Sequence, residues 1–130
     1  MKPFLKVVAC VCLLAACGGL PKVYNVPTRH MTVTGTTMRQ VILSAGSKKG
    51  WTMYEISDGL IEATLSRRGH DVTVRIPYTE DSYAIEYKYS ANMYYNAKKN
   101  TIHRKYNQWV RNLDLAITQA ANPSVGVNAQ

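Results

Sequence analysis

A stretch of alternating apolar and polar residues, from residue 51 to residue 90, constrains the fold of this 130-residue chain more than any other feature. The apolar positions fall two apart in two runs: Ile61, Ala63 and Leu65, then Val72, Val74 and Ile76. Successive side chains of a strand point to opposite faces, so this pattern predicts an antiparallel sheet with one face covered and the other in water. Turn residues at Asp58-Gly59, 67–70 and 79–81 divide the stretch into a meander of three or four strands.

Apolar residues with a helical repeat precede the alternating stretch and follow it. The first repeat has the spacing i, i+3, i+4, i+7 and consists of Met38, Val41, Ile42 and Ala45. A threonine at 34, 36 or 37 is suited to cap this helix. The second repeat begins after Thr101, a suitable cap, and stops at Asn122-Pro123. The order predicts one α+β domain over residues 35–121: a helix, the antiparallel meander and a C-terminal helix, with both helices packed on one face of the sheet.

An apolar run of ten residues, 7–16, lies close to the N-terminus and is followed directly by Cys17. A membrane-spanning helix needs about 20 apolar residues, whereas about 7–15 is typical of the core of a signal peptide. Leu14-Ala15-Ala16-Cys17 resembles the lipobox of bacterial lipoproteins. The resemblance implies that residues 1–16 are a signal peptide that is removed, and that Cys17 carries lipid. A plain secretory signal is the alternative.

Residues 17–34 connect this signal to the predicted domain. The segment contains two prolines and shows weak periodicity, which predicts a lipidated N-terminus and a tether. Residues 30–34 alternate weakly, so a short edge strand is the alternative there. In the resemblance to lipoproteins, Gly18 in place of an aspartate after the cysteine implies the outer membrane, on its periplasmic side; the inner membrane and the cell surface are the alternatives. At the other end of the chain, residues 122–130 are predicted as a flexible tail.

Removal of residues 1–16 would leave a basic chain whose single cysteine is Cys17. Lys2 and Lys6 leave with the signal, so fourteen basic residues remain against eight acidic ones, a net charge of +6. Such a chain attracts anionic partners, which in a bacterial envelope are phospholipid head groups, lipopolysaccharide phosphates or acidic proteins. Nucleic acid is excluded as a partner because the signal directs the chain away from it. A domain without cysteine also excludes cysteine catalysis and cysteine-based metal sites.

Basic side chains cluster at one predicted turn and around the start of the last helix. They are the candidate anion- or partner-binding residues: Arg67, Arg68, His70, Lys98, Lys99, Arg104 and Lys105. If the sheet brings the two groups together, each Lys or Arg contributes about 1 kcal/mol to attraction by an anionic membrane. The alternative interpretation is ordinary solvated surface charge.

Tyrosine is the most conspicuous compositional bias, with nine residues. Those that suggest a candidate aromatic face are Tyr87, Tyr89, Tyr94 and Tyr95. Exposed aromatic rings stack on sugars or bases, whereas a row of tyrosines in a half-buried strand more commonly belongs to the core with its hydroxyls at the rim. Both interpretations stay open at the level of sequence.

The sequence contains no pattern typical of an enzyme or a metal site. Its three histidines, at 30, 70 and 103, lack metal-ligand spacing, and there is no serine-nucleophile motif or phosphate-binding glycine loop. We therefore expect no catalytic residue, no metal and no cofactor.

A second resemblance covers residues 36–117 and involves uncharacterised small proteobacterial lipoproteins. The residues that carry it are Gly50-Trp51, Arg68-Gly69-His70, Tyr87 to Ser90, Asn92, Ile102-His103, Tyr106-Asn107 and Trp109. It brings no known activity with it. Together with the N-terminus, it implies a membrane-anchored lipoprotein that acts as a binding or envelope-assembly component. The alternative is a periplasmic inhibitor or ligand-binding lipoprotein that uses the tyrosine and basic residues.

Overall fold

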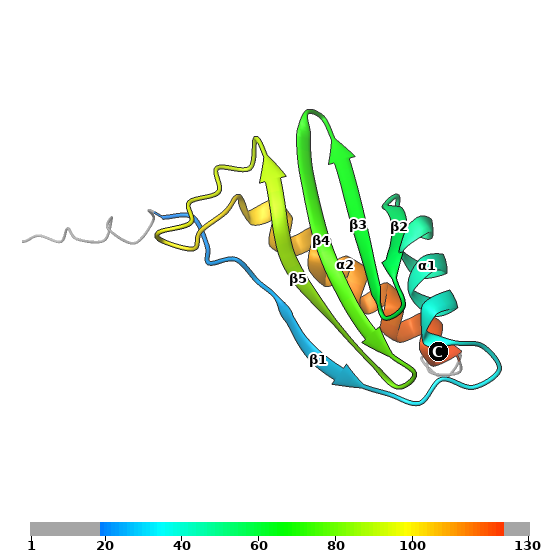
Figure 1. The fold of residues 1–130 in the computed structure, drawn as a ribbon. Coiled ribbons are helices and arrows are strands. Elements are labelled where there is room, and N and C mark those ends of the chain that lie inside the picture. The colour runs from blue at the N-terminus through cyan, green and yellow to red at the C-terminus, as the bar shows by residue number, and fades with distance from the viewer. Residues whose placement is uncertain (1–18, 124–130) are drawn as a thin grey trace, which may run out of the picture.

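The computed structural model describes residues 19–123, which contain five strands and two helices. In chain order these are β1 (Val26–His30), α1 (Met38–Lys48), β2 (Thr52–Ser57), β3 (Leu60–Arg67), β4 (His70–Thr79), β5 (Ser82–Ala91) and α2 (Arg104–Ala121) (Figure 1). The predicted signal peptide, Cys17 and residues 124–130 of the predicted tail lie outside the described residues.

Strands β2 to β5 form the predicted meander, and β1 adds a fifth strand to it. The strands lie in the order β1-β5-β4-β3-β2, and every neighbouring pair is antiparallel. The α+β class and the antiparallel meander are therefore confirmed. The number of strands is five, however, and not three or four.

Strand β1 lies within the segment predicted to be a tether, so that prediction is wrong for Val26–His30. Val26 pairs with Ile85 of β5 and is only 1% exposed. It is the one fully buried position of the strand, and Pro27 follows it directly, so the segment shows no clear alternation. Because β1 is an edge strand, a proline is tolerated there. The short edge strand suggested at residues 30–34 is not found there, because β1 ends at His30 and residues 31–34 form no strand.

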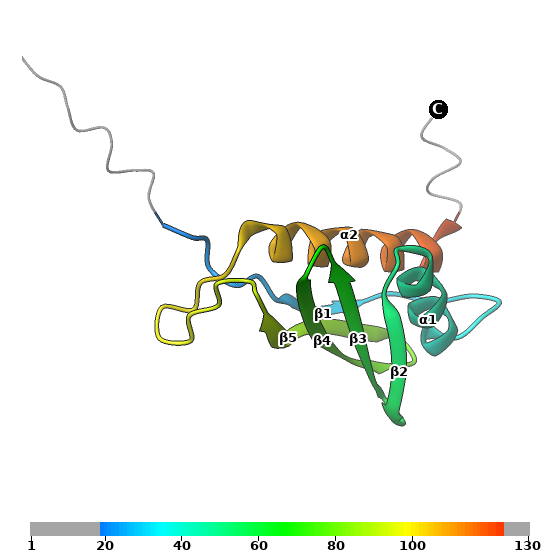
Figure 2. The same ribbon diagram turned by 90° about the horizontal axis from the view of Figure 1, so that it is seen from above.

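Both helices cover the same face of the sheet. Figure 2 shows α2 running across this face, with α1 beside it at the β2 edge. The core between the layers includes Ile42 of α1, Val74 of β4 and Ile117 of α2, none of which is exposed. The other face is uncovered, and on it the hydroxyls of Thr64 and Thr73 lie 3.0 Å apart in a cross-strand hydrogen bond. The predicted packing on one face is confirmed.

The start of each helix is capped by a side chain. Thr37, one of the three threonines predicted as a cap for α1, accepts a hydrogen bond from the Gln40 N–H at 3.2 Å. For α2 the predicted cap, Thr101, is wrong. His103 occupies that position, and its Nδ1 accepts a hydrogen bond from the Lys105 N–H at 3.0 Å. Thr101 instead forms a short backbone bridge with Asn96.

Hydrogen bonds hold the segment that enters the domain against the start of α2. The Asn107 side chain accepts a hydrogen bond from the Tyr24 N–H and donates one to the Lys22 carbonyl, each at 2.9 Å. The Ile102 N–H donates to the Pro21 carbonyl at 3.0 Å. These bonds fix the place at which the chain enters the fold, beside the loop that joins β5 to α2.

Candidate functional site

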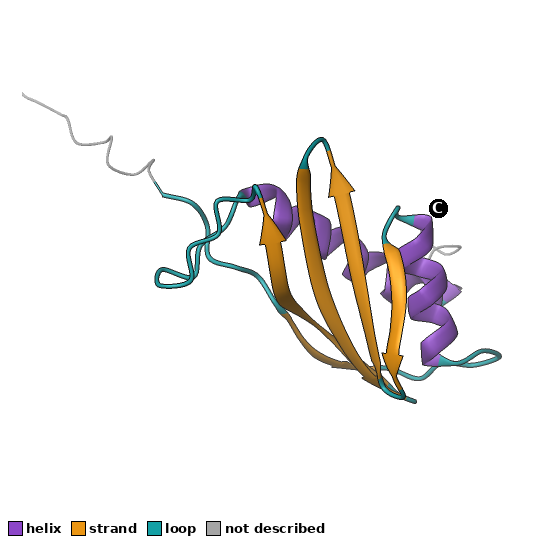
Figure 3. Ribbon diagram, turned by 45° about the horizontal axis from the view of Figure 1, so that its top comes forward, coloured by secondary structure: helices purple, strands orange, loops and turns teal. Residues whose placement is uncertain are grey.

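Three connections of the fold meet at one end of the sheet: the β3–β4 turn, the loop from β5 to α2, and the entering segment (Figures 1 and 3). The Asn92 amide donates a hydrogen bond to the Gly69 carbonyl at 2.8 Å, and His70 Nδ1 lies 2.7 Å from the Asn92 carbonyl oxygen. Lys22 Nζ donates to the Lys99 carbonyl at 2.8 Å. We call these three segments, residues 19–24, 67–70 and 92–105, the basic end.

Charge is distributed unevenly between the two ends of the sheet. The basic end holds Lys22, Arg67, Arg68, Lys98, Lys99, Arg104 and Lys105. Its three segments contain no aspartate or glutamate, and Asp71 is the first acidic residue beyond them along β4. The turns at the opposite end of the sheet carry Asp58, Glu80 and Asp81. The basic end is therefore a region of positive potential on a polarised domain.

The segments that carry the predicted basic residues lie at the same end of the sheet, but the Arg67 side chain turns toward the end of α1. Its Nη2 donates to the Lys49 carbonyl at 3.2 Å, and it lines a small cavity of about 210 Å³ with Trp51 and Trp109. Arg104 lies on the other side, where it lines a cavity of about 300 Å³. Arg67 and Arg104 of the predicted set thus line two different cavities.

The cavity beside Arg104 includes two of the aromatic rings of the basic end, Tyr94 and His103. It is lined by Gly19, Leu20, Pro21, Tyr94, His103 and Arg104. The Tyr94 ring stacks on His103 with centroids 6.1 Å apart, and the His70 and His103 rings lie 5.6 Å apart. The Tyr94 hydroxyl, the His103 ring and the Arg104 guanidinium line the cavity and offer hydrogen-bond donors to an anionic group, whereas the His70 Nδ1–H is donated to the Asn92 carbonyl.

The role of His103 as a cap determines its protonation. Its Nδ1 accepts the Lys105 N–H, so this nitrogen must be unprotonated and the neutral ring carries its hydrogen on Nε2. Burial lowers the pKa of His103, and the neighbouring His70, Lys105 and Arg104 lower it further. The neutral ring presents an N–H donor and keeps the helix capped.

The predicted tyrosine face is divided between the two sides of the sheet. Tyr87 packs on the helical side, where it stacks on Tyr95 with ring centroids 4.4 Å apart and meets Tyr106 edge-on at 5.5 Å. A bulge in β5 opposite Thr73 and Val74 interrupts the pairing, and Tyr89 is 56% exposed. The core interpretation therefore applies to Tyr87. Tyr94 and Tyr95, which are 71% and 41% exposed, belong to the surface of the basic end.

Left-handed backbone conformations are concentrated at the basic end. The non-glycine residues with positive φ in the described chain are Arg68 (53°), Asn92 (60°), Tyr94 (55°) and Asn100 (55°), and all four lie in the three segments of this end. Asparagine adopts this conformation readily, whereas other side chains lose about 1–2 kcal/mol there. Arg68 and Tyr94 are thus held in place at some cost in stability, which is common at functional sites.

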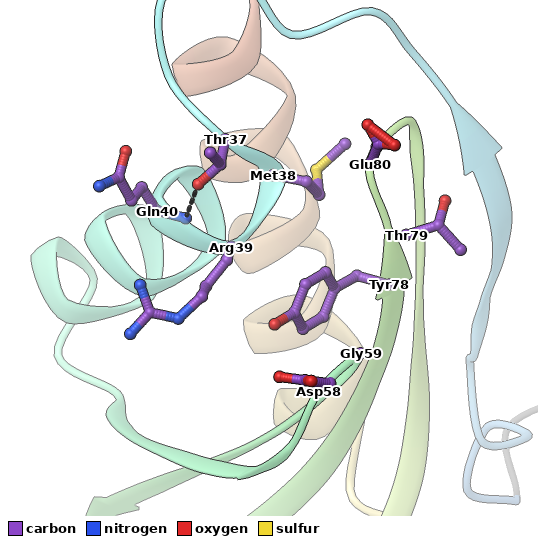
Figure 4. A pocket seen from close by; sticks show the side chains of 9 residues that line it. All are labelled: Thr37, Met38, Arg39, Gln40, Asp58, Gly59, Tyr78, Thr79 and Glu80. Atoms are coloured by element: carbon purple, nitrogen blue, oxygen red, sulfur yellow. Dashed lines mark hydrogen bonds between the residues drawn. The ribbon is translucent and has the colours of Figure 1, made fainter.

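A second hollow lies at the opposite end of the sheet, around the start of α1 (Figure 4). It measures about 430 Å³ and is lined by Thr37, Met38, Arg39, Gln40, Asp58, Gly59, Tyr78, Thr79 and Glu80. Two of its side chains that carry hydrogen-bond donors already have partners: Thr37 caps α1, and Arg39 forms an ion pair with Glu55 of β2. This hollow therefore offers fewer free donors to a ligand than the basic end does.

Sequence reasoning missed two contributors to the basic end, Leu20 and Lys22, because both lie in the segment predicted to be a tether. Leu20 is 44% exposed beside Tyr94, and Lys22 is bonded to the loop at Lys99.

Two further findings concern residues 19–123 only. Neither of their helices combines the length and the apolar character needed to cross a bilayer, and no three of their histidine, aspartate and glutamate side chains converge as a metal site requires.

Comparisons with protein-family models, with curated proteins and with solved structures give no match to this chain.

Proposed function

We propose that this chain is a lipid-anchored protein of the bacterial envelope that faces the periplasm and acts as a binding or assembly component through its basic end. The observation that carries the proposal is the convergence of separate segments at this end. The entering segment, the β3–β4 turn and the β5–α2 loop lie at the same end of the sheet, and the turn and the loop carry the seven predicted basic or imidazole residues, of which Arg67 turns toward the end of α1.

A binding role fits the arrangement of the two imidazoles better than catalysis does. His103 uses Nδ1 to cap α2, and the hydrogen-bond partner of His70 Nδ1 is the Asn92 carbonyl. Among the described residues, neither ring is hydrogen-bonded to a carboxylate, which is the usual way in which a protein orients a catalytic histidine. The donors of this end are arranged to hold an anionic group rather than to transfer its protons.

A ligand-binding or inhibitory lipoprotein is the second candidate function. The cavity of about 300 Å³ between Leu20, Tyr94 and Arg104 favours it, because this space can receive a small anionic group or a side chain of a partner. The two candidates share one surface and differ in whether the partner is a small molecule or a macromolecule.

The lipid anchor is tested by replacing Cys17 with serine. We expect Cys17→Ser to abolish incorporation of radiolabelled palmitate and to release the protein from the membrane fraction, since serine has no thiol to receive the diacylglyceryl group. Retention of the variant in membranes after a salt wash would contradict the proposed anchor.

The binding role is tested by crosslinking the intact lipidated protein in cells, followed by mass spectrometry. We expect its crosslinks to form at the basic end and to be lost when Arg68 and Arg104 are replaced by glutamate. Arg75→Glu is the matched control, because Arg75 is an exposed arginine in the middle of β4, away from this end. Equal loss in the control would mean that net charge, and not this surface, determines binding.

A further inference from the structure

The basic end combines positive charge with exposed apolar and aromatic side chains. Leu20, Tyr94 and Tyr95 are 44%, 71% and 41% exposed, and the segments that carry them also carry Lys22, Lys98, Lys99 and Arg104. Leu20 and Tyr94 line the same cavity, and exposed apolar side chains that lie together commonly mark an interaction surface. Tyrosine and leucine beside lysine and arginine are instead typical of protein surfaces that rest at the level of lipid head groups.

The anchor point lies next to the same surface. Gly19 and Leu20 line the cavity with Tyr94 and Arg104. Two peptide units separate Cys17 from Gly19, so covalent geometry limits the distance between their Cα atoms to about 7 Å. A lipid on Cys17 therefore keeps the basic end close to the bilayer, whereas the turns with Asp58 and Glu80 lie at the far end of the sheet.

Because the anchor already holds the domain at the membrane, a weak contact between the basic end and the bilayer is sufficient for docking. Each lysine or arginine close to an anionic bilayer raises surface affinity about fivefold, and the effect extends over a Debye length of about 8 Å in physiological salt. Once the chain is anchored, docking becomes an intramolecular step, so a few such charges are enough. The acidic turns at the opposite end are repelled by the same surface, which favours a single orientation.

We propose that the basic end docks on the anionic phospholipid head groups of the membrane to which the chain is anchored, so that the domain stands with this end on the bilayer and its acidic turns in the periplasm. This inference rests on the lipid anchor of the proposed function. Tyr94, Tyr95 and Leu20 enter the head-group layer, and Arg68, Lys98, Lys99 and Arg104 contact the lipid phosphates.

The test uses the full-length lipidated protein in vesicles of phosphatidylcholine, with or without phosphatidylglycerol. The described residues contain no cysteine, so single labels are introduced by Ser66→Cys near the basic end and by Ser57→Cys near the acidic turns, both at exposed positions. Energy transfer from each label to an acceptor dye on a lipid head group reports its height above the bilayer.

We expect phosphatidylglycerol to increase energy transfer from the label at residue 66 and to leave the label at residue 57 far from the bilayer. The increase should disappear in high salt and in the variant Arg68→Gln, Lys98→Gln, Lys99→Gln, Arg104→Gln. Arg75→Gln should keep it. Thermal melts check that the fourfold variant folds, and if it does not, Arg68→Gln and Arg104→Gln are measured singly and should each reduce the increase.

Two results would overturn the inference while the proposed function stands: a protein that stays in the vesicles but shows no dependence on phosphatidylglycerol, or one whose label at residue 57 is the nearer of the two. Crosslinking of the basic end to an acidic protein, without a response to anionic lipid, would likewise replace the lipid by a protein partner. Failure of the lipidated chain to remain with vesicles at all is a different outcome, because it contradicts the anchor itself.

Discussion

His103 lies where the loop of the basic end becomes α2, and its ring caps the helix only in the neutral form. Its pKa is lowered in the folded protein by burial and by neighbouring positive groups. The unfolded chain therefore binds a proton at a higher pH than the folded one. The stability that His103 contributes is present above the ordinary histidine pKa of about 6.5 and is lost as the pH falls through the lowered folded value.

We expect His103→Asn to reduce this acid sensitivity, because asparagine is a favourable cap that does not titrate. The measurement is the melting temperature of both proteins at about pH 7 and about pH 5. The fall between the two should be larger in the unmodified protein. An identical fall in both would show that the cap does not contribute to the pH dependence.

Arg68 occupies a position that favours another residue. Arg67 and His70 pair across the β3–β4 turn, and the two residues between them, Arg68 and Gly69, both have positive φ. This is the geometry of a type I′ turn, for which Asn-Gly is the preferred sequence. Arginine is less stable than asparagine at this position of the turn, but it supplies a positive charge at the tip.

We therefore predict that Arg68→Asn raises the free energy of unfolding by about 0.5–1 kcal/mol and at the same time weakens binding through the basic end. Chemical denaturation and the crosslinking experiment measure the two effects separately. A destabilised Arg68→Asn variant would contradict the account of this turn.

At the scale of elements, one polar cluster joins α2 to both β1 and β5. Asp114 of α2 accepts hydrogen bonds from Arg29 Nε and Nη2 at 2.8 and 2.7 Å, and from the Tyr83 hydroxyl at 2.5 Å. The bond from Asp114 raises the pKa of Arg29, and burial followed by the same carboxylate raises that of Tyr83. The cluster is what fastens the short edge strand to the helical layer.

Removal of this carboxylate should loosen β1. We predict that Asp114→Ala lowers the free energy of unfolding by about 1–3 kcal/mol, since the buried Tyr83 hydroxyl loses an acceptor and Arg29 loses its partner. Glu55→Gln is the control, because it breaks an exposed ion pair with Arg39 that contributes little. Denaturant titration compares the two, and an equal effect of both substitutions would be inconsistent with this role for Asp114.

The elements differ in how well the sequence predicts them. Strands β3 and β4 have one covered face, so burial imposes a period of two that is visible in the sequence. Strand β1 has a single fully buried residue and a proline, and its position depends on Asp114 and Ile85, which are distant in sequence. The bulge in β5 likewise depends on how β5 pairs with β4. Tyr87 and Tyr89 are two residues apart and would lie on one face of a regular strand, but the bulge places them on opposite faces.

For the candidate site too, features that depend on nearby residues can be predicted from the sequence, whereas contacts between distant segments cannot. Residue type and turn signals were sufficient to predict Arg68, His70, Lys98, Lys99, Arg104 and Lys105 as candidates. The contact of His70 with Asn92, and of Lys22 with the loop, depends on how the strands are ordered in space. No sequence pattern marks Leu20 or Lys22, because an isolated residue in a proline-containing segment has no period.

At the scale of the whole molecule, the domain is an electrostatic dipole with the basic end near the point where the chain enters the fold. The acidic residues Asp58, Glu80 and Asp81 occupy the turns at the other end, where Arg39 pairs with Glu55, and Lys88 pairs with Glu62 between the two ends. A polarised molecule of this kind presents one end to an anionic partner, whether that partner is a lipid or a protein.

The measurement that tests this account most directly is hydrogen exchange of the lipidated protein in its native membrane, compared with the same protein in neutral detergent. We predict that the membrane slows amide exchange in residues 67–70 and 92–105 and leaves the β4–β5 turn at 79–81 unchanged. Protection confined to that turn or to the uncovered face of the sheet, with no change at the basic end, would contradict it.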